Sequence, residues 1–284
     1  MDNNIKNQTR ILWDKCFSEE DQRFVDFYFE KRYNEQDNIH IEKDGKVVSA
    51  MQLISYPFSY YGKTIGCAYL SGCCTDPEYR SQGLMNDLII KALNQAKNNG
   101  ACFAALIPAS ESLFNYYEGT NFISTFDYSK IRIKRQQSTG QQSVSGCQII
   151  SLQDYKTTRL QDESELDFYQ VYDYFNSKMR ARNCCIQHDE YDFGVITEDM
   201  ELFDNHLLVA KYGEDICGLA FCYLRNDEIF IKDVFAESTA IFTDLITAAA
   251  NIFENETINI IIPPVPGQKT HKLGMARIID AETM

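Results

Sequence analysis

Apolar positions recur with two different periods along this chain, and the switch between them predicts its secondary structure. The run Ile65–Thr75 is nearly continuous in apolar residues, as a buried strand requires. The stretch that follows has apolar side chains at the three- and four-residue spacing of a helix packed on a sheet, namely Leu84, Met85, Leu88, Ile89, Ala92, Leu93 and Ala96. The pattern therefore predicts a strand, a short turn and an amphipathic helix.

The first half of the chain shows an ordered series of such elements. They are helices at 6–17 and 19–33, strands at 39–42, 47–56 and 64–75, the amphipathic helix, a strand at 101–107, a helix at 111–118 and a strand near 126–133. A Gln/Ser/Gly-rich stretch at 136–146 follows and is typical of a linker. We expect a first domain over 1–135.

The second half repeats this order. Its predicted elements are helices at 163–182 and 189–202, strands at 207–211, 216–224 and 228–235, a helix at 238–253 and a strand at 258–262. The sequence thus favours an α/β (α+β) fold of two tandem domains, 1–135 and 147–284, each with a mixed central sheet flanked by helices.

The turn between strand and helix carries the candidate chemistry of the first domain. It runs from Asp76 to Met85 and contains Arg80 and Gly83. A helix start leaves backbone N–H groups without internal partners and bears the positive end of the helix dipole, so the stretch from Arg80 to Met85 can present several donors to a diphosphate. Gly83 allows close approach to the backbone. The corresponding turn of the second half, 236–239, has no Arg or Gly and contains Glu237, which repels phosphate.

Arg80, Gly83 and their setting resemble the acetyl-CoA loop of the GCN5-related N-acetyltransferases (GNAT), although Met85 stands where that signature has Gly or Ala. Together with 72–77, the loop is similar to the enhanced-intracellular-survival (Eis) branch. The resemblance implies the GNAT fold, a degenerate second domain and acetyl-CoA as cofactor. It also implies a set of cofactor-binding residues: Cys73, Cys74, Thr75, Arg80, Ser81, Gln82, Gly83, Leu84, Met85, Asn86, Ser110 and Glu111.

A second segment, around Tyr117, also resembles the family, and it lies at the expected distance after the first. The resemblance aligns Tyr117 with a family tyrosine that faces the thioester sulfur, and Phe122 with a family aromatic. It makes Tyr117 the candidate general acid, with Tyr116 as its neighbouring control. Asn121 replaces the usual Gly, and Asn tolerates a positive φ better than other non-glycine residues.

Eis-like proteins also carry a third, sterol-carrier-like domain, which we expect to be absent here. The segment 274–280 resembles the junction where that domain would begin. In the family the terminal carboxylate can reach the active site, and whether Met284 does so stays open.

Two parts of the mechanism cannot be assigned from the sequence. Glu111, Glu30 and Asp26 are candidates for the general base, with a solvated helix face as the more ordinary explanation of each. Cys73 or Cys74 could be an acyl-carrying nucleophile, but no adjacent His or other base is visible, which favours structural thiols.

Composition narrows the class of protein. The net charge of −14 argues against a nucleic-acid surface and mildly favours a cationic substrate, although many proteins are acidic for solubility alone. The ten cysteines lack metal-type spacing, as do the four histidines, so no metal site is expected. No apolar run is long enough to span a membrane and the first ten residues lack a signal-type apolar core, so we expect a cytoplasmic protein. A homo-oligomer is a separate possibility.

The leading functional prediction is an acetyl-CoA-dependent N-acetyltransferase that acts by direct transfer to a small-molecule or peptide amine. A non-catalytic acyl-CoA sensor or interaction protein with the same fold is the rival from another class. A third hypothesis is an acyltransferase that acts on a protein or aminoacyl substrate through the surface of its second domain.

Overall fold

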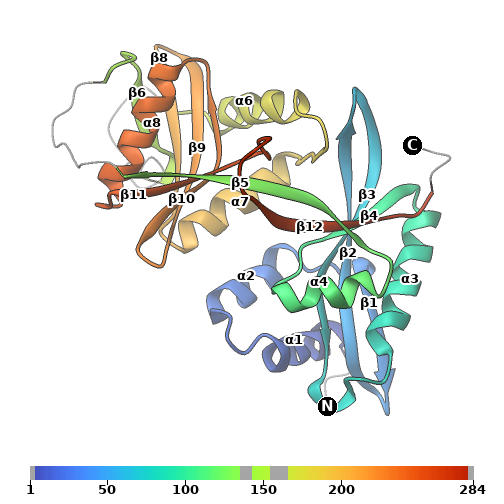
Figure 1. Cartoon of the computed structure of the whole chain (residues 1–284). Helices are drawn as coiled ribbons and strands as arrows, with labels where there is room; N and C mark the ends of the chain where they lie inside the picture. Colours follow the sequence, from blue (N-terminus) through green and yellow to red (C-terminus); the bar gives the residue numbers. More distant parts are fainter. Residues whose placement is uncertain (1–3, 135–142, 154–165, 281–284) are drawn as a thin grey trace. The chain divides into compact units, whose positions relative to one another are not determined.

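The computed structural model of the chain describes residues 4–134, 143–153 and 166–280 (Figure 1). Its contacts divide the chain into two compact units. The first unit consists of Met1–Phe126, Asn183–Gln187 and Lys272–Met284, and the second of Asp127–Arg182 and His188–His271. The first unit therefore ends at Phe126, before the predicted boundary at 135, and includes two later segments that were predicted to belong to the second domain. The predicted linker at 136–146 lies mostly outside the described residues, as does Met284.

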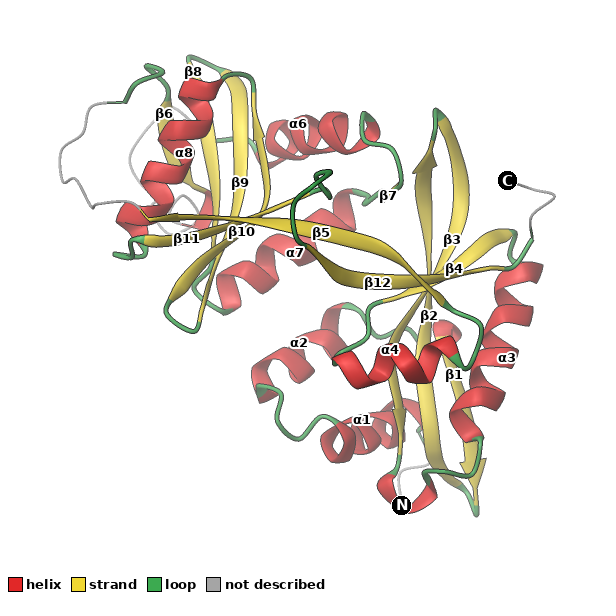
Figure 2. Ribbon diagram, viewed as in Figure 1, coloured by secondary structure: helices red, strands yellow, loops and turns green. Residues whose placement is uncertain are grey.

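The first unit is a mixed sheet with helices on both faces (Figure 2). Its strands are ordered β1-β2-β3-β4-β12, where β1 is Asn38–Lys43, β2 Lys46–Tyr60, β3 Lys63–Thr75, β4 Ala101–Leu106 and β12 Thr270–Ile278. Only β3 and β4 pair in parallel, across the helix α3 (Leu84–Asn98) that connects them. The two-residue strand β7 (Cys185–Ile186) adds to β2 at Phe58 and Ser59.

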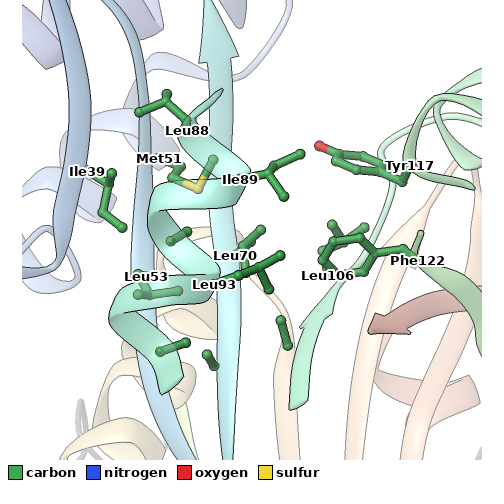
Figure 3. Packing of buried hydrophobic residues seen from close by; sticks show 14 of the residues in the cluster. Ile39, Met51, Leu53, Leu70, Leu88, Ile89, Leu93, Leu106, Tyr117 and Phe122 are labelled. Atoms are coloured by element: carbon green, nitrogen blue, oxygen red, sulfur yellow. The ribbon is translucent and has the colours of Figure 1, made fainter. Parts of the chain in front are cut away.

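Each face of this sheet has its own apolar core. Helices α1 (Ile5–Cys16) and α2 (Gln22–Lys31) pack on one face through Trp13, Tyr28 and Phe29. On the other face, α3 and α4 (Glu111–Glu118) bury a cluster that includes Ile89, Leu106, Tyr117 and Phe122, several of which are seen together in Figure 3. This second core holds the predicted catalytic tyrosine.

The second unit repeats the layered arrangement. Its strands are ordered β5-β11-β10-β9-β8-β6, from β5 Ile123–Lys134, β11 Thr257–Ile262, β10 Glu228–Ala236, β9 Asp215–Arg225, β8 His206–Tyr212 and β6 Gln148–Ser151. Helix α8 (Thr239–Ile252) covers one face. Helices α6 (Phe168–Arg180) and α7 (Glu190–Leu202) pack at the other through stacked Phe175 and Phe193 rings, with centroids 4.9 Å apart.

The two units share a bulge in corresponding β-hairpins. In the first unit the β1–β2 pairing shifts between Ile41 and Glu42, which leaves Val48 as an extra residue of β2. In the second unit the β8–β9 pairing shifts between Ala210 and Lys211, which leaves Cys217 as the extra residue of β9. A bulge at the same place of two hairpins supports the prediction of tandem copies of one fold.

The predicted elements of both halves form. The helix predicted from residue 84 begins at Leu84, and the one predicted at 111–118 has those bounds. Strands β6, β7 and β12 are present but were not predicted. Among the residues that the structure describes, no helix has the length and apolar character that crossing a membrane requires.

Candidate active site

The end of β3 is an open strand edge built around a bulge. Pairing of β3 with β4 stops at Tyr69 and Ala105, although β3 continues to Thr75. On its other edge the register with β2 shifts, so that Gly72 and Cys73 lie opposite Met51 alone. Gly72 has a φ of 59°, and a Cβ atom there would lie 2.1 Å from Cζ2 of Trp13. Only glycine fits this position, and the bulge lies just beyond the point where β4 ends at Leu106.

The turn after β3 has the backbone geometry of an anion site. A short 3-10 helix at Pro77–Tyr79 is followed by Ser81 with a φ of 61° and Gly83 with a φ of 79°. A Cβ atom on Gly83 would meet nothing within 4 Å, so a ligand can approach its backbone. Residues 80–83 are exposed, and the first intrahelical bond of α3 is from the N–H of Asp87 to Gly83. Among the described residues, the N–H groups of 83–86 have no protein acceptor.

Helices α3 and α4 differ from the other described helices in the capping of their N-termini. In α1, α2, α6, α7 and α8, a side chain at the N-cap accepts from the first turn. Among the described helices, only α3 and α4 lack such a cap: their N-cap residues are Gly83 and Ser110. The Ser110 hydroxyl instead lies 2.9 Å from that of Ser112. Free donors at a helix start bind an anion well, so the capping pattern agrees with the predicted position of the diphosphate.

The end of α1 holds the start of this turn in place. Lys15 Nζ lies 2.7 Å from a carboxylate oxygen of Asp76, and Cys16 Sγ lies 3.2 Å from the carbonyl oxygen of Thr75. Arg80 Nε donates to the same carbonyl at 3.2 Å. Hydrogen bonds from Cys74 and Arg80 lower the pKa of the Cys16 thiol to about 7. The sequence did not single out Lys15 or Cys16, because their role depends on the docking of α1.

Tyr117 is buried near the end of α4 in the core shown in Figure 3, and the Cys73 thiol packs against the same core. Burial, reinforced by that thiol, raises the pKa of Tyr117 well above its usual value, so the phenol keeps its proton. The turn that follows has Asn121 at a φ of 63°, as predicted. The carbonyl of Tyr117 accepts from the N–H groups of Thr120 and Phe122 at 2.9 and 3.1 Å, which fixes the end of the helix.

Cys73 and Cys74 point to opposite faces of β3. Cys73 packs against the core of α3 and α4, whereas Cys74 belongs to the core of α1 and α2. Burial raises the pKa of Cys73 to about 11, and the pKa of Cys74 is raised well above its usual value by its hydrogen bond with Cys16 and by burial. Both are poor nucleophiles as thiols, which supports a structural role.

The candidate bases lie on exposed surfaces. The side chains of Glu30 and Asp26 are 71% and 66% exposed on α2, and Arg10 lies 2.6 Å from Asp26. The hydrogen bond from Arg10 lowers the pKa of Asp26, which weakens it as a base. Ser110 and Glu111 lie at the start of α4, at the end of the helix away from Tyr117.

The equivalent turn in the second unit is closed to an anion. Ser238 caps α8 by accepting from the N–H of Ile241 at 3.3 Å. Glu237 stands immediately before it and pairs with Lys178 and with Tyr174. A capped helix beside a carboxylate lacks the free donors of α3, in agreement with a degenerate second copy.

Comparisons with known proteins agree with this geometry. Residues 5–122 match the family model described as an acetyltransferase (GNAT) domain. None of the curated protein sequences matches the chain significantly.

The fold of the whole chain recurs in solved structures. A probable N-acyltransferase from Enterococcus faecalis has a TM-score of 0.72 at 13% identity, and the match covers 100% of this chain and 72% of that one. Eis1 from Mycobacterium abscessus has a TM-score of 0.68 at 10% identity, with coverage of 98% and 72%. N-myristoyltransferase from Saccharomyces cerevisiae, solved with bound myristoyl-CoA, has a TM-score of 0.56 at 10% identity, with coverage of 96% and 80%.

The family match spans α1 to α4, which are the elements that build the open strand edge, the uncapped helix start and the buried tyrosine. The structural matches cover both units. Residues 5–122 therefore form a domain that matches the GNAT acetyltransferase family, in a chain whose fold is similar to that of Eis1.

Proposed function

We propose that the protein is an acetyl-CoA-dependent N-acetyltransferase that transfers the acetyl group directly to a primary amine. The observation that carries the proposal is that one unit combines three features: the uncapped start of α3, the end of β3 that lacks a partner on its β4 side, and the protonated phenol of Tyr117, which packs with Cys73 of that strand end. Each meets one requirement of aminolysis of a thioester.

Binding of the coenzyme falls to the start of α3. The free N–H groups of residues 83–86 and the dipole of a 15-residue helix favour a diphosphate there. The open space around Gly83 allows the phosphate oxygens to reach these donors. Acetyl-CoA supplies the activated acyl group as a thioester.

The acyl group would lie along the end of β3. Those backbone N–H groups of Cys73–Thr75 that face away from β2, toward the edge that β4 leaves, are suited to polarise the carbonyl oxygen. Tyr117 Oη holds a proton that the departing sulfur requires, and the packing of Tyr117 with Cys73 in one core supports this role. We assign these residues binding, polarising and proton-donating roles.

The acceptor must lose a proton before it attacks. An amine with a pKa near that of lysine is neutral in only about one molecule in a thousand at neutral pH, an obstacle of roughly 4 kcal/mol. The acidic composition of the chain, with 41 Asp and Glu against 27 Lys and Arg, supports a cationic acceptor attracted in its charged form.

Two measurements test the proposal. Calorimetry should show acetyl-CoA binding by the wild type and none by Gly83→Glu, which places a carboxylate among the free donors. Gly62→Glu is the matched control, because Gly62 also has a positive φ of 83° and open surroundings but lies in the β2–β3 turn.

A thiol-release assay with polyamines, aminoglycosides and lysine peptides should then identify an acceptor. Wild-type protein that binds no acetyl-CoA would end the proposal. Binding without thiol release toward any amine would favour the non-catalytic acyl-CoA sensor.

A further inference from the structure

A lysine from the first hairpin reaches the turn that begins α3. Lys43 is the last residue of β1, and its Nζ lies 2.7 Å from Oε1 of Gln82. The ammonium group also lies 5.5 Å from the centroid of the Tyr79 ring. One side chain therefore contacts both ends of the 79–82 segment, just before the uncapped N–H groups.

Lys43 forms no ion pair with any carboxylate that the structure describes. Within the described ranges, no carboxylate lies within 4.0 Å of the Lys43 ammonium or of the Arg80 guanidinium. In a chain with an excess of 14 negative charges, two cations at one turn with no carboxylate this close are unexpected, although Arg80 does help to lower the pKa of Asp76. Such a pair favours an anionic ligand.

The side chains of Lys43 and Arg80 are held by different partners. Arg80 Nε is bound to the Thr75 carbonyl, and the guanidinium also interacts with Cys16, so Arg80 is held against the protein. Lys43 is held by the neutral side-chain amide of Gln82, and Gln82 is exposed. An ammonium has three N–H donors, so the remaining donors of Lys43 can bind a further acceptor.

The proposed coenzyme carries more charge than backbone donors neutralise. Coenzyme A has a diphosphate and a separate 3′-phosphate, and the start of α3 supplies only neutral N–H groups. Resting on the proposed function, we propose that Lys43 binds a phosphate of coenzyme A, so that the β1–β2 hairpin forms part of the coenzyme site. Gln82 holds the ammonium in position until the phosphate takes one of its free donors.

The experiment compares acetyl-CoA with 3′-dephospho-acetyl-CoA on the full chain by calorimetry. A charge-assisted hydrogen bond of this kind corresponds to about a tenfold or greater effect on affinity. We expect Lys43→Ala to lower acetyl-CoA affinity by about that factor and Lys43→Arg to retain most of it. Lys46→Ala is the matched control, because Lys46 is the exposed cross-strand partner of Lys43 in the same hairpin.

The two probes identify which phosphate is bound. A loss confined to acetyl-CoA assigns Lys43 to the 3′-phosphate, and an equal loss for both probes assigns it to the diphosphate. Equal affinities of Lys43→Ala and wild type would overturn the inference, as would an equal loss in Lys46→Ala, which would show a non-specific effect of charge. Failure of the wild type to bind either probe would instead refute the proposed function itself.

Discussion

Tyr117 of α4 and Cys73 of β3 pack in one apolar core of the first unit, where the thiol reinforces burial in raising the pKa of the phenol. Cys73 lies beyond Tyr69, the last residue of β3 that pairs with β4. The contact joins a proton-bearing group to the strand that we propose receives the acyl group.

Replacement of Tyr117 by Phe removes this proton and leaves the ring that packs with Phe122. We expect the rate of thiol release at saturating substrates to fall about 100-fold, the lower end of the usual effect of a general acid, with acetyl-CoA affinity unchanged. Tyr116→Phe is the control, because Tyr116 is the neighbouring, 42% exposed tyrosine. Unchanged turnover in Tyr117→Phe would remove the phenol from the mechanism.

Gly72 is expected to be intolerant of any side chain. Gly72→Ala introduces a Cβ atom that would lie 2.1 Å from Trp13 and strains a backbone with a φ of 59°. We expect urea denaturation to show a loss of about 2–5 kcal/mol in the free energy of unfolding. Gly62→Ala, with a positive φ but no atom within 4 Å, should lose only about 1 kcal/mol. Equal losses would show that contact with Trp13 is unimportant.

Hydrogen exchange can report directly on the uncapped helix start. The amides of 83–86 have no described acceptor and should exchange rapidly in the free protein. Saturating acetyl-CoA should slow them by about tenfold or more, because the phosphate oxygens would then accept hydrogen bonds from these N–H groups. The N–H of Ile241 already donates to the Ser238 hydroxyl in the free protein, so its exchange rate should not change on binding. Slowing at α8 rather than α3 would place the coenzyme elsewhere.

Asp244 in α8 gives the second unit a defined sensitivity to acid. Burial opposes its ionisation, but hydrogen bonds from the 143–145 segment outweigh this and lower the pKa from 3.8 to about 2. Because the folded pKa is below the unfolded one, this stabilisation is complete above pH 3.8 and is lost as the pH falls toward 2.

The loss amounts to about 2 kcal/mol in the free energy of unfolding. Urea denaturation at a series of acidic pH values should show a shallower decline for Asp244→Asn than for the wild type. Asp215→Asn, at the exposed β8–β9 turn, should follow the wild type. Parallel curves for all three proteins would contradict the assignment.

The local pattern of the sequence was sufficient for the elements that build the candidate site. Periodicity placed the start of α3 at Leu84, and the Asn at 121 does adopt the positive φ that the turn needs. Both predictions depend on residues close in sequence. The uncapped start of α3 could be anticipated because Gly83 has no side chain to act as a cap.

Features that depend on residues far apart in the sequence could not be predicted from local patterns. Lys43 lies 39 residues from Gln82, and nothing in the sequence around it signals a phosphate. Strand β7 has only two residues, too few for a periodic pattern, and is defined by its pairing with Phe58 and Ser59. The interaction of Tyr117 with Cys73 likewise depends on how α4 packs against the sheet.

In the pairing of β12 with β4, Met275 lies opposite Leu106. This pairing also limits which fragments of the chain can fold when expressed alone. A fragment truncated near residue 135 would leave one side of β4 bare, and bare strands invite association between molecules. During synthesis, this half cannot complete its sheet until Met275–Ile278 have left the ribosome. We therefore expect the acetyltransferase half to be unobtainable as an isolated recombinant domain, and the duplicated half to be a partner in its biogenesis.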